Sequence, residues 1–358
     1  MKKQVITLIT MMALLLMQTA QAAGLEKVCQ LKGKWKFTID DKPAYAKTDF
    51  DDSDWDHIYA PASWESQGYV GYDGIAWYRK TVNIPKPNSD SRLYLSLGKI
   101  DDANQVYFNG VLIGELGTFP PEYETAYNLP VRYPIPTELI RFNQENTLAV
   151  RVFDEKMDGG IVSGDLSIGF DADEQLLEQN LSGNWKLSFK NYKGCRAIGY
   201  DDSEWHDIQV PASWESQGFN NYDGYAWYRK SFQLSENILP QKLYLVLGKI
   251  DDKDKVYLNN VEIGEYRDMY NNPMCNRNHG DWQIRRAYKI PDKLLNVKGP
   301  NTIAIVVYDN GGIGGIHEGP VGLMTKEQYL VYVDKHRYDG DYYFGNTIFN
   351  FIINALVE

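Results

Sequence analysis

The sequence has few cysteines, no excess of positive charge and no second long apolar run. Its 358 residues include three cysteines, and its formal net charge is −11. Nucleic acids and anionic lipids are bound through basic patches, so this charge argues against both as partners. Beyond the N-terminal segment, no stretch is apolar enough to cross a bilayer. The sequence therefore predicts no nucleic-acid partner and no membrane span.

The three cysteines form neither a metal-binding pattern nor a disulfide framework. The spacing of Cys29, Cys195 and Cys275 does not resemble that of a zinc site. In an oxidising compartment an odd count leaves one thiol over. Cys195 and Cys275 both lie in the second half of the chain and are able to pair there. Their spacing leaves the question of a bridge open, because their distance decides it.

The one long apolar run lies at the N-terminus and is typical of a targeting signal. Two lysines precede the run from Ile6 to Met17, and small residues at 20–22 offer a cleavage site. This pattern predicts a secretory signal peptide over residues 1–23, too short to span a membrane. We expect a secreted protein, in the periplasm or on the cell surface of a Gram-negative bacterium.

Helical periodicity is scarce, and a long internal repeat dominates instead. Residues 61–80 read PASWESQGYVGYDGIAWYRK, and residues 211–230 read PASWESQGFNNYDGYAWYRK. Sixteen of these twenty positions are identical, at an offset of 150. LGKIDDANQVYFN at 97–109 recurs at the same offset as LGKIDDKDKVYLN. Solenoid repeats run to about 20–50 residues, so this period indicates a duplicated domain.

The strand signals predict an all-β fold. Leu93, Leu95 and Leu97 alternate with other residues, which places them on one face of a sheet. Aromatic residues make up 13 % of the chain and favour β structure. Asn109-Gly110 and Asn259-Asn260 are hairpin turns that need positive φ. We therefore predict two tandem antiparallel β-sandwich domains.

The repeat also predicts the domain boundaries. The signal peptide covers residues 1–23, the first sandwich 24–172 and the second 173–333. A C-terminal tail at 334–358 has no counterpart in the first repeat, and its apolar residues are able to line a helix face. We expect this tail to pack on a domain or on a partner protein.

The repeated motifs resemble those of the galactose-binding-like jelly roll. The second copy contains, in order, W-x₂-I-x-V-P-A-S-W-E-x-Q-G, Y-D-G-x-A-W-Y-R-K, G-K-I-D-D and V-Y-x-N. This order resembles the N-terminal sugar-binding domain of family 2 glycoside hydrolases and the similar domain of sialate O-acetylesterases. The resemblance covers nearly all of both repeats and implies a jelly-roll fold for each. It implies function less strongly, because sites rather than folds decide function.

In those enzymes catalysis belongs to another domain, which is either a barrel with two glutamates or an esterase domain with a serine nucleophile. A barrel needs about 200 residues or more. Only 25 residues (358 − 333) follow the second repeat. We therefore expect no catalytic residue in this chain.

The sequence contains no motif that indicates a hydrolytic active site. A glycosidase pair needs two carboxylates about 5–10 Å apart, and the sequence gives no reason to place any two across a cleft. The serine-hydrolase motif G-x-S-x-G is absent. Asp101 and Asp102 have an alternative role at a strand end, accepting backbone N–H bonds or pairing with Arg79. The repeated carboxylates are Glu65, Asp73, Asp101 and Asp102, with the copies Glu215, Asp223, Asp251 and Asp252.

Sugar binding has a clearer physical basis. A pyranose stacks its apolar face on an aromatic ring, and its hydroxyls bind carboxylates or arginine. Such residues cluster in the repeated loops, where function is often found. Trp64 and Trp214 have an alternative role as plugs at the sandwich ends, and His317 is a further candidate after a glycine-rich loop. The candidate ligand-binding residues are Trp64, Glu65, Tyr72, Asp73, Arg79, Asp102, Trp214, Glu215, Tyr222, Asp223, Arg229, Asp252 and His317.

A structural calcium ion is a further possibility in acidic turns. Asp49, Asp51 and Asp52, and in the second copy Asp201 and Asp202, supply hard oxygen ligands. Their spacing does not match an EF-hand, and the alternative is a solvated acidic turn. We expect no other cofactor.

These features predict a secreted, non-catalytic protein that binds an oligo- or polysaccharide through two linked modules, in glycan capture or degradation. Linking two weak sites raises avidity without any new contact. One alternative is a hydrolase of the glycoside hydrolase or carbohydrate esterase kind. Another is a structural or assembly module that docks a partner protein through its tail.

Overall fold

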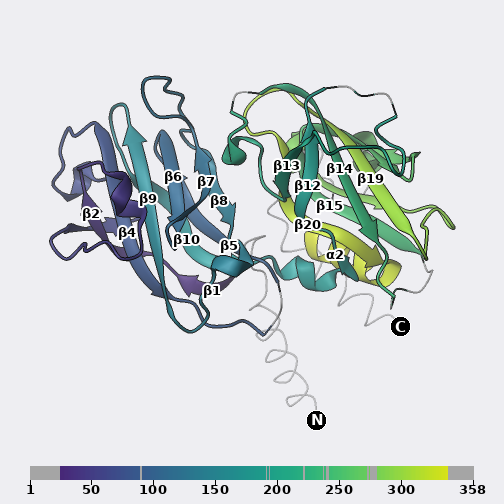
Figure 1. Cartoon of the computed structure of the whole chain (residues 1–358), viewed down its shortest axis with the longest axis horizontal. Helices are drawn as coiled ribbons and strands as arrows, with labels where there is room; N and C mark the ends of the chain where they lie inside the picture. The colour runs from purple at the N-terminus through teal and green to yellow at the C-terminus, as the bar shows by residue number, and fades with distance from the viewer. Residues whose placement is uncertain are drawn as a thin grey trace, which may run out of the picture.

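The computed structural model describes residues 25–88, 91–190, 192, 194–220, 222–236, 238, 242–271, 274 and 280–337. Two β-sandwiches lie side by side along the long axis of the molecule (Figure 1). The predicted signal peptide lies outside the described residues, and so does the tail after Arg337. Both remain predictions.

Each sandwich consists of one four-stranded and one six-stranded sheet, and every pairing is antiparallel. The four-stranded sheet of the first sandwich has the order β1 (Glu26–Gln30), β10 (Ile161–Phe170), β5 (Leu93–Ile100) and β8 (Pro130–Pro134). Its six-stranded sheet has the order β3 (Asp56–Ala60), β2 (Gly33–Thr38), β4 (Gly74–Asn83), β9 (Glu145–Asp154), β6 (Ala103–Phe108) and β7 (Val111–Leu116).

The second sandwich repeats this topology. Its four-stranded sheet has the order β11 (Gln179–Asn180), β20 (Gly315–Thr325), β15 (Leu243–Asp251) and β18 (Arg285–Lys289). Its six-stranded sheet has the order β13 (His206–Val210), β12 (Gly183–Ser188), β14 (Gly224–Gln233), β19 (Pro300–Asp309), β16 (Lys253–Leu258) and β17 (Val261–Glu265). The all-β prediction of two tandem antiparallel sandwiches is confirmed.

The predicted alternation accounts for the core. Leu93, Leu95 and Leu97 are all buried between the two sheets of the first sandwich. The predicted hairpin turns have positive φ at Asn109 (48°) and at Asn259 (49°). Asparagine and glycine populate this region more readily than other residues. Local sequence thus determines both the inward faces and these turns.

The two repeats fill one core position differently. In the first sandwich the hydroxyl of Tyr133 donates to Asn104 at 2.8 Å. In the second, Tyr288 donates instead to Asp254, which also binds Arg286 Nε at 2.7 Å, and both partners of this ion pair are fully buried. Arg286 stands where the first sandwich has a valine, as the pairing of β18 with β15 and of β8 with β5 shows. It also donates to backbone carbonyls, including that of Asp252 at 2.6 Å.

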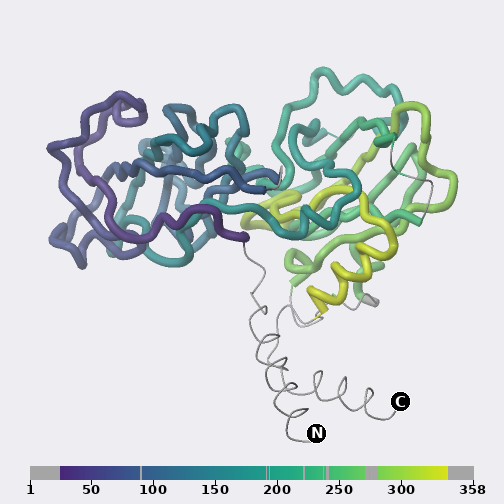
Figure 2. The backbone as a smooth tube through the Cα atoms, turned by 90° about the horizontal axis from the view of Figure 1, so that it is seen from below, coloured from purple at the N-terminus to yellow at the C-terminus, as the bar shows by residue number. Residues whose placement is uncertain are grey.

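The junction between the sandwiches is held by a short 3₁₀ helix and by the last helix of the described chain. The predicted boundary at 172/173 lies in the 3₁₀ helix η4 (Ala172–Leu176). The helix α2 (Lys326–His336) packs on β15 and β20 and on η4, as Figures 1 and 2 show. Asp173 in η4 binds His336 Nε2 and Lys335 Nζ, each at 2.6 Å.

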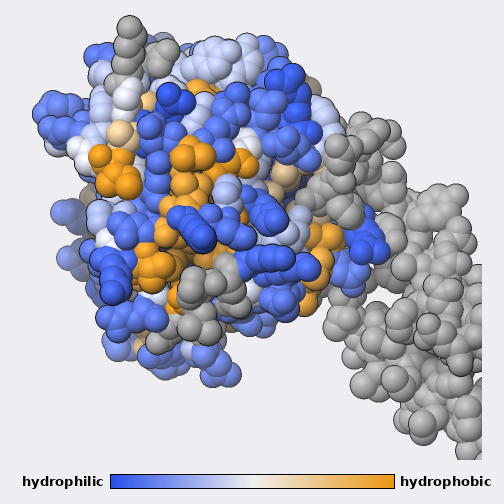
Figure 3. All heavy atoms as spheres, turned by 90° about the vertical axis from the view of Figure 1, so that its right-hand side faces the viewer, coloured by the Kyte–Doolittle hydropathy of each residue, from blue (hydrophilic) through white to orange (hydrophobic). Residues whose placement is uncertain are grey.

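Two pockets lie away from the predicted ligand-binding residues. One of about 620 Å³ is lined by apolar residues of the second sandwich, among them Leu234, Ile290 and Leu295. Figure 3 shows hydrophobic residues exposed between hydrophilic ones on the outer side of that sandwich. A second pocket, of about 460 Å³, lies between the sandwiches and includes Arg92 and Gln209. No described helix is long and apolar enough to serve as a membrane span.

Candidate functional site

The repeated tryptophans plug the sandwich ends. Trp64 precedes the 3₁₀ helix η2 (Glu65–Gln67), Trp214 precedes η5 (Glu215–Gln217), and both rings are 0 % exposed. A Cβ on Gly159 would lie 2.1 Å from the ring of Trp64, and the glycine packed on Trp214 leaves equally little room. Neither ring presents a face to a ligand. The predicted stacking role of Trp64 and Trp214 is therefore wrong, and the alternative role as a plug is correct.

The repeated arginines are also structural. Arg79 is buried, and its Nε binds Asp52 Oδ2 at 2.8 Å while Nη1 donates to the carbonyls of Tyr45 and Lys47. Arg229 binds Asp202 at 2.8 Å in the same way. Each guanidinium fastens the loop that follows the second strand of its sandwich. We therefore correct the prediction that Arg79 and Arg229 bind ligand.

The same contacts account for the acidic turns. Asp52 and Asp202 pair with the arginines, while Asp51 and Asp201 each accept a backbone N–H at 3.0 Å, from Ser53 and Ser203. Asp49 is exposed. In the described parts of the chain, none of these aspartates belongs to a group with the spacing of metal ligands. They are turn-forming residues, and the calcium site predicted at Asp49, Asp51, Asp52, Asp201 and Asp202 is not supported.

Two loops meet at one end of each sandwich through the repeated glutamates. Glu65 Oε2 accepts the N–H of Gly159, and Glu215 Oε2 accepts that of Gly314, both at 3.0 Å. Glu65 is half-buried, whereas Glu215 is buried, because the η5 loop packs against β7 of the first sandwich. Burial raises the pKa of Glu215 to about 8. The same sequence motif therefore places its glutamate in a half-buried position in the first sandwich and in a buried position in the second.

A group of aspartates lies at the same end in each repeat. In the first sandwich it comprises Asp101 and Asp102, after β5, and Asp154, the last residue of β9. Burial, together with the charge of Asp102, raises the pKa of Asp101 to about 6. Burial also raises the pKa of Asp154 to about 7, and Asp101 and the exposed Asp73 add to the effect. Asp73 therefore lies at the rim of this group.

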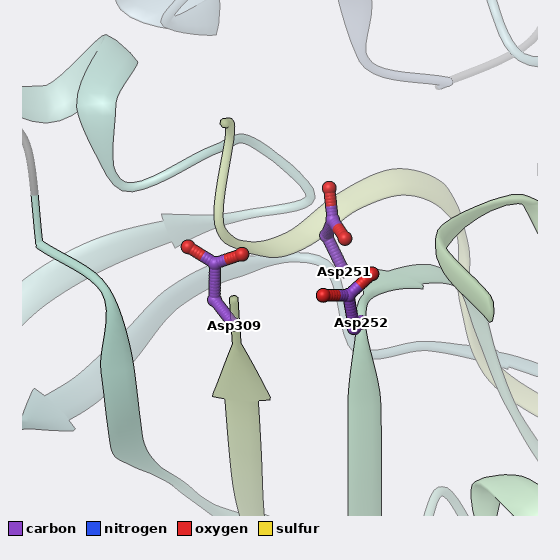
Figure 4. A group of neighbouring side chains, drawn as sticks. All are labelled: Asp251, Asp252 and Asp309. Atoms are coloured by element: carbon purple, nitrogen blue, oxygen red, sulfur yellow. The ribbon is translucent and has the colours of Figure 1, made fainter. Parts of the chain in front are cut away.

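The second sandwich has the equivalent group in Asp251, Asp252 and Asp309 (Figure 4). Burial raises the pKa of Asp309, and the exposed Asp223 contributes to that shift. Burial and the adjacent Asp252 raise the pKa of Asp251. We call these two groups, Asp101/Asp102/Asp154 and Asp251/Asp252/Asp309, the first and second acidic ends.

Asp154 and Asp309 were not among the predicted site residues, although the sequence holds a signal for them. Leu148, Val150 and Val152 alternate inward along β9, and Asp154 occupies the next inward position. Asp309 continues the inward series of β19 in the same manner. A carboxylate at an inward position of a strand is costly to bury, and its occurrence in both copies marks a site.

The predicted tyrosines are fixed beside the acidic ends. Tyr72 is half-buried, contacts the ring of Trp64 and donates its hydroxyl to the carbonyl of Ile75 at 2.7 Å. Tyr222 donates to the carbonyl of Tyr225 at 2.9 Å. Their hydroxyls are already bonded to backbone carbonyls, so these contacts give no support to a ligand-binding role of Tyr72 and Tyr222.

His317 has surroundings of its own. Its Nε2 lies 3.4 Å from the carbonyl of Trp282, and burial lowers its pKa to about 4. The neighbouring Glu318 pairs with Lys249 at 2.9 Å and with Arg285 at 3.3 Å. His317 thus lies beside an ion-pair network, and these contacts give no support to its role as a ligand-binding residue.

The cysteine question concerns a residue outside the described range. Cys195 is buried and Cys29 is half-buried, and neither forms a disulfide with a described residue. Cys275 is not among the described residues. The pairing of Cys195 with Cys275 stays a prediction.

Comparison with known proteins gives a family match and several partial relatives. A family model described as the second all-β domain of β-galactosidase matches residues 40–158 and 200–312, one segment in each repeat. A β-galactosidase of Vibrio vulnificus (strain CMCP6) is 32 % identical over 140 residues, which are 34 % of this chain and 13 % of that protein. A β-glucuronidase of Formosa agariphila is 27 % identical over 99 residues, 24 % of this chain and 10 % of that protein.

Solved structures with a related arrangement include a β-glucuronidase of Bacteroides uniformis, with a TM-score of 0.32 and 18 % identity over 78 % of this chain and 28 % of that chain. A family 2 glycosyl hydrolase of Bacteroides cellulosilyticus gives a TM-score of 0.36 and 16 % identity, covering 79 % and 32 % of the two chains. The matched relatives are thus much longer than the segments they share with this chain. The family model spans most of both repeats, and it confirms the predicted resemblance to the all-β domains of family 2 glycoside hydrolases. The chain belongs to the family of the β-galactosidase second all-β domain.

Proposed function

We propose that this protein binds carbohydrate without catalysis, through the acidic end of each sandwich. The observation that carries the proposal is the burial of Asp154 and Asp309 at inward strand ends, with the exposed Asp73 and Asp223 contributing to the raised pKa of each. The raised pKa of Asp154 favours a carboxyl group that donates a hydrogen bond, and the carboxyl oxygens of both ends are acceptors. Sugar hydroxyls require both kinds of partner.

The acidic ends favour a neutral sugar. Burial raises the pKa of several carboxyls at both ends, and an acidic sugar would add further negative charge there. Of the relatives, those named β-galactosidases act by name on neutral galactosides, and those named β-glucuronidases on an acidic sugar. We therefore propose a neutral, galactose-containing glycan as the ligand.

Binding fits these residues better than hydrolysis does. A glycosidase needs a nucleophile or base free to act on the sugar. Glu65 and Glu215 each use one oxygen to hold a loop N–H. Export through the N-terminal signal, to the periplasm or cell surface, belongs to the same proposal.

The test is calorimetric titration of the full chain with galactose-containing oligosaccharides and with a glucuronide. We expect binding of the neutral oligosaccharides, weakened at least about fivefold, or about 1 kcal/mol, in Asp73→Asn and Asp223→Asn. Asp54→Asn, which changes an exposed aspartate away from both ends, is the matched control and should bind as the wild type does. Absence of saccharide binding, or turnover of a chromogenic galactoside that is lost in Glu65→Gln, would refute the proposal.

A further inference from the structure

Three carboxyl groups from two separate segments converge at the second acidic end. Asp251 ends β15, Asp252 follows it directly, and Asp309 ends β19. One oxygen of each lies within 4.8 Å of the other two. Figure 4 shows the three carboxyl groups turned toward one another at the ends of neighbouring strands. Among the residues that the structure describes, no lysine or arginine forms an ion pair with any of them.

Asp309 supplies an observation independent of the consecutive Asp251–Asp252 pair. Its side chain is 1 % exposed, and its Oδ1 accepts the N–H of Gly311 at 3.1 Å. Its Oδ2 is fully buried and has no hydrogen-bond partner in the described part of the chain. This carboxyl faces Asp251 and Asp252 (Figure 4). A buried acceptor without a partner costs about 1–3 kcal/mol, and a ligand bound at the end of β19 would remove this cost.

In the first sandwich protein atoms satisfy Asp102, whereas Asp154 Oδ2, like Asp309 Oδ2, is buried without a hydrogen-bond partner among the described residues. There Asp102 Oδ1 accepts the hydroxyl of Thr125 at 2.6 Å, and Oδ2 accepts the N–H of Glu155 at 2.7 Å. Thr125 belongs to the loop before β8, whose counterpart in the second repeat differs in length and sequence. In the second sandwich, Asp252 Oδ2 accepts the N–H of Asn310 at 3.2 Å. The described residues of the first sandwich hold no comparable group of three converging carboxyls.

We propose that Asp251, Asp252 and Asp309 bind a divalent cation of the size of calcium. All three offer the hard oxygen ligands that calcium prefers. Two ligands on opposite sides of a calcium ion lie about 4.6–5.2 Å apart, whereas around magnesium they lie about 4.0–4.2 Å apart. Separations within 4.8 Å allow all three oxygens to reach one such ion, and the flexible, oxygen-rich coordination of calcium suits three carboxylates from two segments. Asp252 is half-buried, so water is able to complete the coordination sphere from its side.

This site differs from the one that the sequence predicted and goes beyond the proposed sugar binding. The predicted ligands, Asp51 and Asp201 among them, close their own turns. The proposed ligands come from the ends of two strands, and contacts outside the proposed site hold the backbone of both strands in place. Arg286 fixes the carbonyl of Asp252, and β19 pairs with β14 along its whole length. The ion would thus enter a preformed site.

The test is calorimetric titration of calcium chloride into the full chain after removal of metal with EDTA. We expect one calcium ion per chain and a melting temperature that rises on calcium addition. Asp309→Asn and Asp252→Asn should each weaken calcium binding by at least about tenfold, or about 1.4 kcal/mol. Asp51→Asn, at the turn predicted from sequence, should bind calcium as the wild type does. Magnesium chloride in a parallel titration should bind more weakly than calcium.

The variants also report on folding. Asparagine keeps an acceptor for the N–H of Gly311, so the melting temperature of Asp309→Asn in EDTA shows whether that variant folds. If Asp309→Asn does not fold, the half-buried Asp252→Asn carries the test. Absence of calcium binding by the wild type, undiminished binding by Asp252→Asn, or loss of binding in Asp51→Asn would overturn the proposal. Equal binding of magnesium would overturn the assignment to calcium.

Discussion

Replacing Asp154 by asparagine should stabilise the first sandwich at alkaline pH. The side chain of Asp154 is fully buried, its Oδ1 accepts the N–H of Lys156 at 3.0 Å, and its Oδ2 has no hydrogen-bond partner among the described residues. Asparagine has nearly the same shape, keeps the acceptor and removes the charge. The substitution therefore isolates the cost of ionising this carboxyl group.

The magnitude follows from the pKa. Folding raises the pKa of Asp154 from 3.8 to about 7, and each pH unit corresponds to about 1.4 kcal/mol. The folded state holds the proton more tightly than the unfolded state, so stability falls as the pH rises from about 4 to about 7 and stays low above that. The full cost is ~4 kcal/mol, and rearrangement of Asp101 reduces the expected gain to about 2 kcal/mol.

Calorimetric unfolding at pH 4 and pH 8 measures this effect. We expect Asp154→Asn to unfold at the same temperature as the wild type at pH 4, and about 4–8 °C higher at pH 8. Asp54→Asn, at an exposed position, should change neither value. Equal destabilisation by Asp154→Asn at both pH values would refute the reasoning, since it would mean that the carboxylate contributes contacts rather than repulsion.

Three further predictions concern structural contacts. Gly159→Ala places a methyl group 2.1 Å from the ring of Trp64 and should lower stability to urea by about 1–3 kcal/mol; an unchanged urea midpoint would contradict the plug role. Arg79→Lys keeps the charge but loses the guanidinium fork that binds Asp52 and two backbone carbonyls. It should lower the free energy of unfolding in urea by about 2–3 kcal/mol. Equal urea midpoints of the variant and the wild type would show that the fork is dispensable. Burial tends to raise the pKa of Asp173, but hydrogen bonds and charge from His336 and Lys335 hold it below its usual value. This stabilisation is present at neutral pH and is lost as the pH falls below about 4, so Asp173→Asn should increase hydrogen exchange in α2 at pH 7; exchange as slow as in the wild type would argue against the contact.

Much of the fold could be predicted because it follows local rules. Leu93, Leu95 and Leu97 are spaced at the period of a strand, and all three are buried. Asn109 and Asn259 adopt the positive φ that their turns require. The family match through both repeats agrees with motifs that are visible in the sequence alone.

The candidate site was harder to predict because burial depends on distant packing. Trp64 has an identical counterpart in Trp214. This identity is expected both for a shared core position and for a shared binding surface, so the sequence alone does not distinguish the two roles. Glu65 and Glu215 lie in identical motifs, yet only Glu215 is buried, since β7 of the other sandwich covers η5. Asp154 could have been predicted as a buried residue, because the strand alternation places it inward. Its raised pKa also reflects the charge of Asp101, which lies more than fifty residues earlier in the chain.

The buried pair Asp254–Arg286 limits how the two repeats can exchange parts. β16 carries Asp254 and β18 carries Arg286, separated in sequence by the loop that differs most between the copies. Recombination that moved β16 into the first repeat without β18 would leave an aspartate in the core with no cation, at a cost of about 3–5 kcal/mol. Exchange between the copies should therefore preserve stability only for a block that contains both strands, even though the copies share sixteen identical residues in twenty in their longest common motif.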